Sequence, residues 1–166
     1  MIRILIADDH SIVRHGLKQI VSECPGMVVA GEAASGQEVL DLVRKHDFDV
    51  AIVDIAMPGR GGLEILKDLK AEKPLMKVMV LSMYSEEQYA IRSFRDGASA
   101  YLTKASAPDE LVQAIRTVAK GKRYITPSVR WIRNSLPTSC SPIASSWSWC
   151  CSEAGNRSAT SRASSP

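Results

Sequence analysis

The sequence predicts an α/β fold for residues 1–122: a doubly wound, five-stranded parallel sheet with helices on both faces. The first observation is that apolar runs of strand length alternate five times with amphipathic helical patterns. The second is the run 50–53, which is apolar throughout and therefore indicates a strand buried on both faces, as parallel strands usually are. Because crossovers between parallel strands are right-handed, few topologies remain.

The elements follow in order along the chain. Strands are expected at residues 2–7, 27–31, 49–54, 77–82 and 100–103. Apolar residues at helical spacing predict helices around 12–21, 39–43, 63–69, 89–94 and 111–118. Ser35 with Glu38 three residues later predicts a capping box at the second helix. Asp109 after Pro108 predicts the start of the last helix.

Polar residues stand where the expected strands end. The pair Asp8–Asp9 follows the first strand, and Asp54 ends the third. Ser82 ends the fourth strand and Lys104 follows the fifth. Open α/β sheets bind ligands at the carboxyl ends of their strands, so these side chains are expected to converge there. Carboxylates, a hydroxyl and an ammonium at one edge predict a site for a divalent cation and a phosphoryl group.

Each of these residues also has an ordinary structural explanation. Asp8–Asp9 fits a solvated loop or a helix cap, Asp54 fits a turn, and Lys104 fits a surface lysine. Their joint placement at strand ends favours the functional interpretation. An aspartate can attack phosphorus only if negative charge is neutralised, and a metal with a lysine would do that. Three histidines are expected at helix ends or on the surface rather than as a ligand set: His10, His15 and His46.

Several short motifs occur in one order and spacing along residues 1–122. They are Ala7–His10, Val53–Gly59, Gly61–Glu64, Val80–Ser82, Gly97–Lys104 and Ala107–Leu111. Together they resemble the receiver domain of bacterial two-component response regulators, in the NarL/FixJ subfamily that carries LuxR-type DNA-binding domains. The resemblance implies a flavodoxin-like receiver fold. It also implies a regulator that a histidine kinase phosphorylates in order to control transcription.

The resemblance further implies a phosphoacceptor and a cation site. Asp54 would accept the phosphoryl group. Asp8 and Asp9 would hold Mg²⁺, or Mn²⁺, together with Asp54, and the backbone carbonyl of Ala56 would supply another oxygen. Hard oxygen donors suit Mg²⁺, which keeps several waters and accepts phosphate in its shell.

The remaining implied roles concern phosphate contact and switching. Lys104 would pair with the phosphoryl oxygens, Ser82 would hydrogen-bond the phosphate, and Tyr101 would follow Ser82 by changing rotamer. The implied partners are a histidine kinase and a second copy of the chain on phosphorylation. DNA is expected as a partner only through an intact LuxR-type domain.

Two alternatives come from other functional classes. The chain could be a stand-alone receiver that acts by protein contact or as a phosphate sink. It could also be a magnesium-dependent phosphatase of the haloacid-dehalogenase type, although such enzymes need a second acid where this chain has Ala56. The response-regulator interpretation predicts no enzyme beyond self-phosphorylation and autodephosphorylation.

The location expected for the protein is the cytoplasm. Cys24 is the only cysteine in residues 1–122, which fits a reducing compartment. The amino terminus is expected to be a strand rather than a signal peptide. No apolar run is long enough to span a membrane, so no membrane association is expected.

Residues 123–166 differ in composition from the rest. They hold five Arg, one Glu and no Lys and so carry a charge of +4, whereas residues 1–122 are nearly neutral; the net charge of +3 therefore comes from this segment. They also contain all three Trp, three of the four Cys and 12 Ser, without apolar periodicity. Such a segment is expected to be a disordered tail without a DNA-recognition helix.

A shifted reading frame offers an origin for this tail. With synonymous codons chosen freely, one frame over residues 145–166 permits a leucine-rich helix, then Gly-Lys, and a further helix. This resembles the opening of a LuxR-type helix-turn-helix domain. The hypothesis is that a frameshift near residues 128–130 removed the DNA-binding domain.

Overall fold

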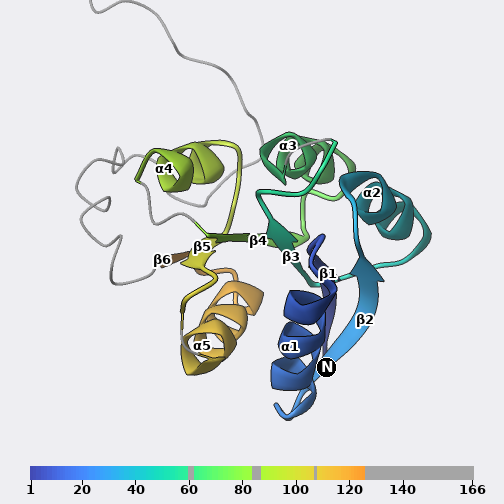
Figure 1. Cartoon of the computed structure of the whole chain (residues 1–166), viewed down its shortest axis with the longest axis vertical. Helices are drawn as coiled ribbons and strands as arrows, with labels where there is room; N and C mark the ends of the chain where they lie inside the picture. Colours follow the sequence, from blue (N-terminus) through green and yellow to red (C-terminus); the bar gives the residue numbers. More distant parts are fainter. Residues whose placement is uncertain (60–61, 84–86, 107, 126–166) are drawn as a thin grey trace, which may run out of the picture. The chain divides into compact units, whose positions relative to one another are not determined.

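The computed structural model describes residues 1–59, 62–83, 87–106 and 108–125. Six parallel strands form one sheet in the order β2-β1-β3-β4-β5-β6 (Figure 1). They are β1 (Ile2–Ala7), β2 (Met27–Ala33), β3 (Val50–Asp54), β4 (Lys77–Ser82), β5 (Ala100–Thr103) and β6 (Tyr124–Ile125). The expected doubly wound parallel sheet is therefore confirmed.

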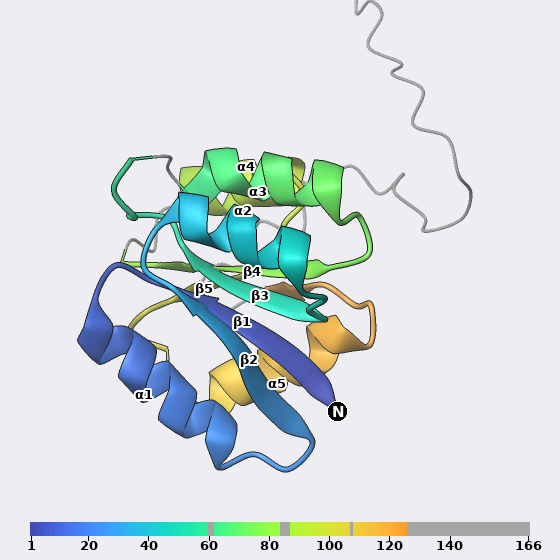
Figure 2. The same cartoon turned by 90° about the vertical axis from the view of Figure 1, so that its right-hand side faces the viewer.

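Helices cover both faces of this sheet. They are α1 (Ser11–Ser22), α2 (Gly36–Lys45), α3 (Gly62–Glu72), α4 (Glu87–Arg95) and α5 (Pro108–Ala119). Figure 2 shows α1 and α5 on one face and α2, α3 and α4 on the other. Within the described residues, no helix is both long and apolar enough to cross a membrane.

Local sequence signals explain where two helices begin. At α2, the Ser35 side chain accepts a hydrogen bond from the Glu38 backbone N–H at 3.4 Å. The Glu38 carboxylate in turn accepts from the backbone N–H of Ala34 at 2.8 Å, one residue before the position that a capping box uses. Helix α5 begins at Pro108, a residue whose fixed backbone angle suits the first helical position.

The prediction of five strands was wrong by one. Tyr124–Ile125 forms β6, which pairs with Ala100 and Tyr101 of β5. Two residues carry no period-2 pattern, so this pairing at the sheet edge was not readable from the sequence. Strand β6 also lies inside the segment 123–166 that was expected to be an irregular tail, and residues 126–166 lie outside the described residues.

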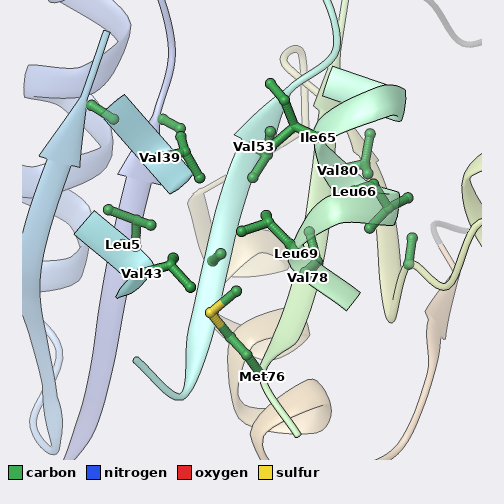
Figure 3. Close-up of a cluster of buried hydrophobic side chains, with 14 of the residues drawn as sticks. Leu5, Val39, Val43, Val53, Ile65, Leu66, Leu69, Met76, Val78 and Val80 are labelled. Carbon is green, nitrogen blue, oxygen red and sulfur yellow. The ribbon is translucent and has the colours of Figure 1, made fainter. Parts of the chain in front are cut away.

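Alternating side chains on the central strands build two cores. On β3, Ala51 and Val53 join the cluster under α2, α3 and α4, whereas Val50 and Ile52 join the cluster under α1 and α5. Figure 3 shows the first cluster, in which Val53 lies among side chains of α2, α3 and β4. All five residues of β3 are buried, as the apolar run predicted. The strand that carries Asp54 is therefore held from both sides.

Candidate functional site

The parallel strands bring the predicted site residues to one edge of the sheet. Asp8 follows β1, Asp54 is the last residue of β3, Ser82 is the last residue of β4, and Lys104 follows β5. The strands end nearly level, because the register pairs Ala7 with Val53, Asp54 with Leu81, and Ser82 with Thr103. Side chains that are far apart in the sequence therefore meet, as the strand pattern predicted.

Lys104 is the charge at the centre of this edge. Its Nζ donates a hydrogen bond to Asp54 Oδ2 at 2.7 Å. Asp8 Oδ2 also lies 2.7 Å from Nζ, but this contact is an ion pair without hydrogen-bond geometry. The side chains of Asp8 and Asp54 are fully buried, and that of Lys104 is 8% exposed. One ammonium thus faces two buried carboxylates.

Burial and charge act in opposite directions on the pKa of Lys104. The largest single effect is desolvation, which lowers this pKa because burial disfavours the charged form. The hydrogen bond to Asp54, the short contact with Asp8 and the negative charges of both carboxylates together outweigh it and raise the pKa above its ordinary value. Lys104 therefore stays an ammonium in the described structure.

Loop N–H groups fix the other oxygens of the two carboxylates. The backbone N–H of His10 donates to Asp8 Oδ1 at 2.8 Å, and that of Ala56 donates to Asp54 Oδ1 at 3.1 Å. Each carboxylate therefore has one oxygen on its own loop and the other facing Lys104. The carbonyl of Ala56 remains a predicted ligand, for which the structure gives no contact.

Four side chains could together hold a cation: Asp8, Asp9, His10 and Asp54. Each offers a ligand atom within 4.8 Å of the others. Asp8 Oδ2 and Asp9 Oδ1 are buried and accept no hydrogen bond from any described residue. Asp8 Oδ2 already faces the Lys104 ammonium, whereas Asp9 Oδ1 has the His10 ring beside it. Clustered carboxylates repel one another until positive charge neutralises them, and oxygen donors suit a hard divalent cation, so this donor set fits one.

Arg14 was missed by the sequence reasoning. Its Nη1 donates to the backbone carbonyl of Asp8 at 2.7 Å and to that of Asp9 at 3.4 Å. The guanidinium thus ties the first turn of α1 to the loop that carries both acids. The available signal was a basic residue within one helical turn of the acidic pair.

Gly62 is a second missed residue. A Cβ atom there would collide with the backbone carbonyl of Asp54 and come within 2.8 Å of Ile55 Cα. The Gly62 N–H donates to the Ile55 carbonyl at 3.2 Å. Only glycine allows α3 to begin this close to the end of β3. The signal was the Gly61–Gly62 pair, which the sequence analysis used only as part of the motif Gly61–Glu64.

Ser82 and Tyr101 are both buried beside the site strands. Ser82 is 1% exposed, and its carbonyl accepts a hydrogen bond from the Lys104 backbone N–H at 2.7 Å. Tyr101 is fully buried on β5, in the cluster that also contains Ala90 and Phe94 of α4. Ser82 is therefore connected to the lysine loop, and Tyr101 lies under α4.

The double contact of Lys104 predicts a large effect of Lys104→Met on stability. This change leaves the carboxylates of Asp8 and Asp54 buried without a counter-charge. In urea denaturation with EDTA present, we expect the free energy of unfolding to fall by about 3 kcal/mol. Asp8→Asn in the Lys104→Met background removes one of these two negative charges and should therefore restore part of the lost free energy of unfolding.

The matched control for this prediction is Lys73→Met. Lys73 is a partly exposed lysine whose Nζ lies 2.7 Å from Oδ1 of the 85% exposed Asp47. A surface pair contributes less than about 1 kcal/mol, so this variant should unfold nearly as the wild type does. Equal losses for the two variants would show that the buried ion pair has no special weight.

Known proteins share this site-bearing region. Residues 4–116 match the family model of the response regulator receiver domain. The response regulator GacA of Pseudomonas aeruginosa is 40% identical over 129 residues, which cover 78% of this chain and 60% of that protein. The response regulator UvrY of Escherichia coli is 36% identical over 129 residues, which cover 78% of this chain and 59% of that protein. This chain thus spans about 60% of the length of these curated relatives.

Solved structures agree with these relatives. A two-component response regulator of the LuxR family from Aurantimonas sp. SI85-9A1 has a TM-score of 0.76 and 34% identity, covering 80% of this chain and 96% of that one. The isolated REC domain of RcsB from Salmonella enterica serovar Typhimurium, in the presence of BeF3−, has a TM-score of 0.74 and 27% identity, covering 79% and 97%. The family that the motifs predicted is confirmed: this chain belongs to the response regulator receiver family of two-component systems.

Proposed function

We propose that Asp54 is the phosphoacceptor of this receiver and takes its phosphoryl group from a histidine kinase. The observation that carries the proposal is the contact of Asp54 Oδ2 with Lys104 Nζ, 2.7 Å apart beside the buried Asp8. In the reaction, a carboxylate oxygen of Asp54 forms a bond to phosphorus while the bond from phosphorus to the donor breaks. The donor leaves with the electron pair of that bond, and Asp54 becomes an acyl phosphate.

The same residues support a bound cation during this reaction. Asp8, Asp9 and Asp54, with the carbonyl of Ala56, would hold Mg²⁺ or Mn²⁺. A bound cation would neutralise charge on the phosphoryl oxygens. Lys104 would contribute the second positive charge, because its ammonium already lies against the attacking carboxylate. The activity proposed is limited to self-phosphorylation and autodephosphorylation.

Phosphorylation by a small donor tests this assignment. With acetyl phosphate and Mg²⁺ or Mn²⁺, we expect intact-mass measurement to show one added phosphoryl group, and EDTA should prevent it. Asp54→Asn should abolish the modification because an amide is a poor nucleophile. Asp47→Asn is the matched control, since the Asp47 side chain is 85% exposed and precedes the amino end of β3, whereas Asp54 lies at its carboxyl end. Equal labelling of the Asp54→Asn protein would remove Asp54 from the role.

We further propose that Ser82 and Tyr101 transmit phosphorylation to α4. Phosphate can shift an equilibrium only if it binds one conformation better than another. Ser82 and Lys104 lie at the ends of adjacent strands and would supply that difference through contacts to phosphoryl oxygens. Tyr101 lies two residues before the end of β5 and packs in the α4 cluster, so it is placed to respond.

NMR with a phosphate mimic tests this coupling. On addition of BeF3− and Mg²⁺, we expect amide shifts to extend from Asp54 through Ser82 to Tyr101 and α4. The Asp54→Asn protein, which lacks the carboxylate that receives the mimic, is the control and should show no such spread. Shifts confined to the loops after β1 and β3 would count against the Ser82–Tyr101 route.

The wider role proposed is control of transcription. RcsB, a structural relative at 26% identity and a TM-score of 0.74, has been solved as dimers bound to DNA. We propose that phosphorylation of this receiver likewise promotes a homodimer, and that DNA is bound through an intact LuxR-type domain. No role at a membrane is proposed.

The domain division expected at residue 122 lies before β6, which belongs to the sheet. For the tail, we therefore propose that the receiver domain extends to Ile125 and that the residues after a frameshift near 128–130 have a shifted origin. Its support is the change in composition, with all three Trp and five Arg but no Lys after residue 122. Sequencing the coding DNA tests the proposal. We expect an open frame that encodes a LuxR-like helix-turn-helix, shifted from the frame of the tail. A coding sequence without such a frame would refute the frameshift.

A further inference from the structure

His10 lies against the acidic cluster in an unusual arrangement. Its Nδ1 is 2.7 Å from Asp9 Oδ1 and 3.4 Å from Asp8 Oδ1. Yet Asp9 Oδ1 accepts no hydrogen bond from any described residue, so the ring and the carboxylate are close without sharing a proton in hydrogen-bond geometry. The Nδ1 atom of His10 and the carboxylate oxygen of Asp9 are thus in direct contact.

This spacing is that of two neighbouring ligands of one cation. Metal–ligand bonds of about 2.1 Å that meet at right angles place the two ligand atoms about 3 Å apart. Nδ1 of His10 belongs with one oxygen each from Asp8, Asp9 and Asp54 in a set whose members all lie within 4.8 Å of one another. The imidazole therefore stands where a fourth side-chain ligand would stand.

Neither helix capping nor core packing accounts for the position of the ring. His10 is the residue that caps the amino end of α1, but its side chain makes no capping hydrogen bond. Its side chain is 65% exposed, so core packing does not place it. Its backbone N–H donates to Asp8 Oδ1 at 2.8 Å, which fixes the main chain while the ring keeps its own freedom.

We propose that His10 is a nitrogen ligand of the cation site, and that it makes the site favour Mn²⁺ over Mg²⁺ more strongly than carboxylates alone would. The proposal rests on the proposed function for the presence of a cation and adds the identity of a ligand. Carboxylate and carbonyl oxygens suit Mg²⁺, whereas imidazole suits transition metals. The expectation of a helix-end or surface histidine agrees with the position of His10 at the start of α1 and its 65% exposed side chain, and the proposal adds a ligand role to that position.

A competing explanation is that His10 is merely an ionic partner of Asp9. The ligand explanation and the ionic-partner explanation predict different effects on cation binding when the imidazole is removed. Loss of a ligand weakens Mn²⁺ binding more than Mg²⁺ binding, because imidazole contributes more to the transition metal. Loss of an ionic partner frees Asp9 from competition and leaves the binding of both cations equal or stronger.

The experiment uses the full chain and Mn²⁺ as the probe. Pulsed electron paramagnetic resonance detects an imidazole nitrogen bound to Mn²⁺, and ¹⁵N-labelled histidine identifies its source. The chain has three histidines, at positions 10, 15 and 46. We expect nitrogen coupling in the wild type, its loss in His10→Ala, and its retention in the matched control His15→Ala, whose side chain is also exposed.

Affinities give the second readout. We expect His10→Ala to weaken Mn²⁺ binding about tenfold, and to weaken Mg²⁺, measured by competition, less than about threefold. A wild-type spectrum without imidazole coupling, or equal changes for both cations, would overturn the proposal. The variant Asp8→Asn separates the proposal of a cation site from the proposal that His10 is one of its ligands. If Asp8→Asn leaves Mn²⁺ binding intact, the proposed cation site itself fails. If binding needs Asp8 but shows no nitrogen coupling, only the role of His10 fails.

Discussion

The ammonium of Lys104 lies between the carboxylates of Asp54 and Asp8, and the carboxyl edge of the sheet depends on this contact. It joins residues that follow three different strands, so it holds the ends of β1, β3 and β5 at one level. Without a positive charge there, two fully buried carboxylates would face each other in a medium of low polarity. The two apolar cores position the strands, and the ion pair determines how their ends meet.

The contact also orients the carboxylate of Asp54, the proposed phosphoacceptor. Asp54 has one oxygen on the Ala56 N–H and the other on Lys104, so it is oriented before any donor arrives. Orientation by groups that are already in place reduces the reorganisation needed during reaction. Two further residues help to hold the site in place through the backbone. Arg14 binds the carbonyls of the loop that carries Asp8 and Asp9, and Gly62 allows α3 to begin close to Asp54.

Much of the fold and the core of the site could be predicted from the sequence, because buried parallel strands have a strong apolar signature. Asp54 and Lys104 were found because strand ends are where such a pattern places polar residues. His10, Arg14 and Gly62 were not assigned to the site, because their positions depend on how loops fold back over the edge. The two-residue strand β6 was missed because its pairing with β5 is decided by tertiary contact alone.

Strand β6 has a mechanical consequence. In the ladder with β5, Ile125 pairs with Tyr101, and its side chain packs on the same cluster as the tyrosine ring. The last described residue of the sheet therefore lies directly beside a residue that is buried under α4. A fusion partner joined after Ile125 would begin one strand spacing from Tyr101. The length and stiffness of the residues that join it to Ile125 would then determine how closely the orientation of the partner follows the edge of the sheet.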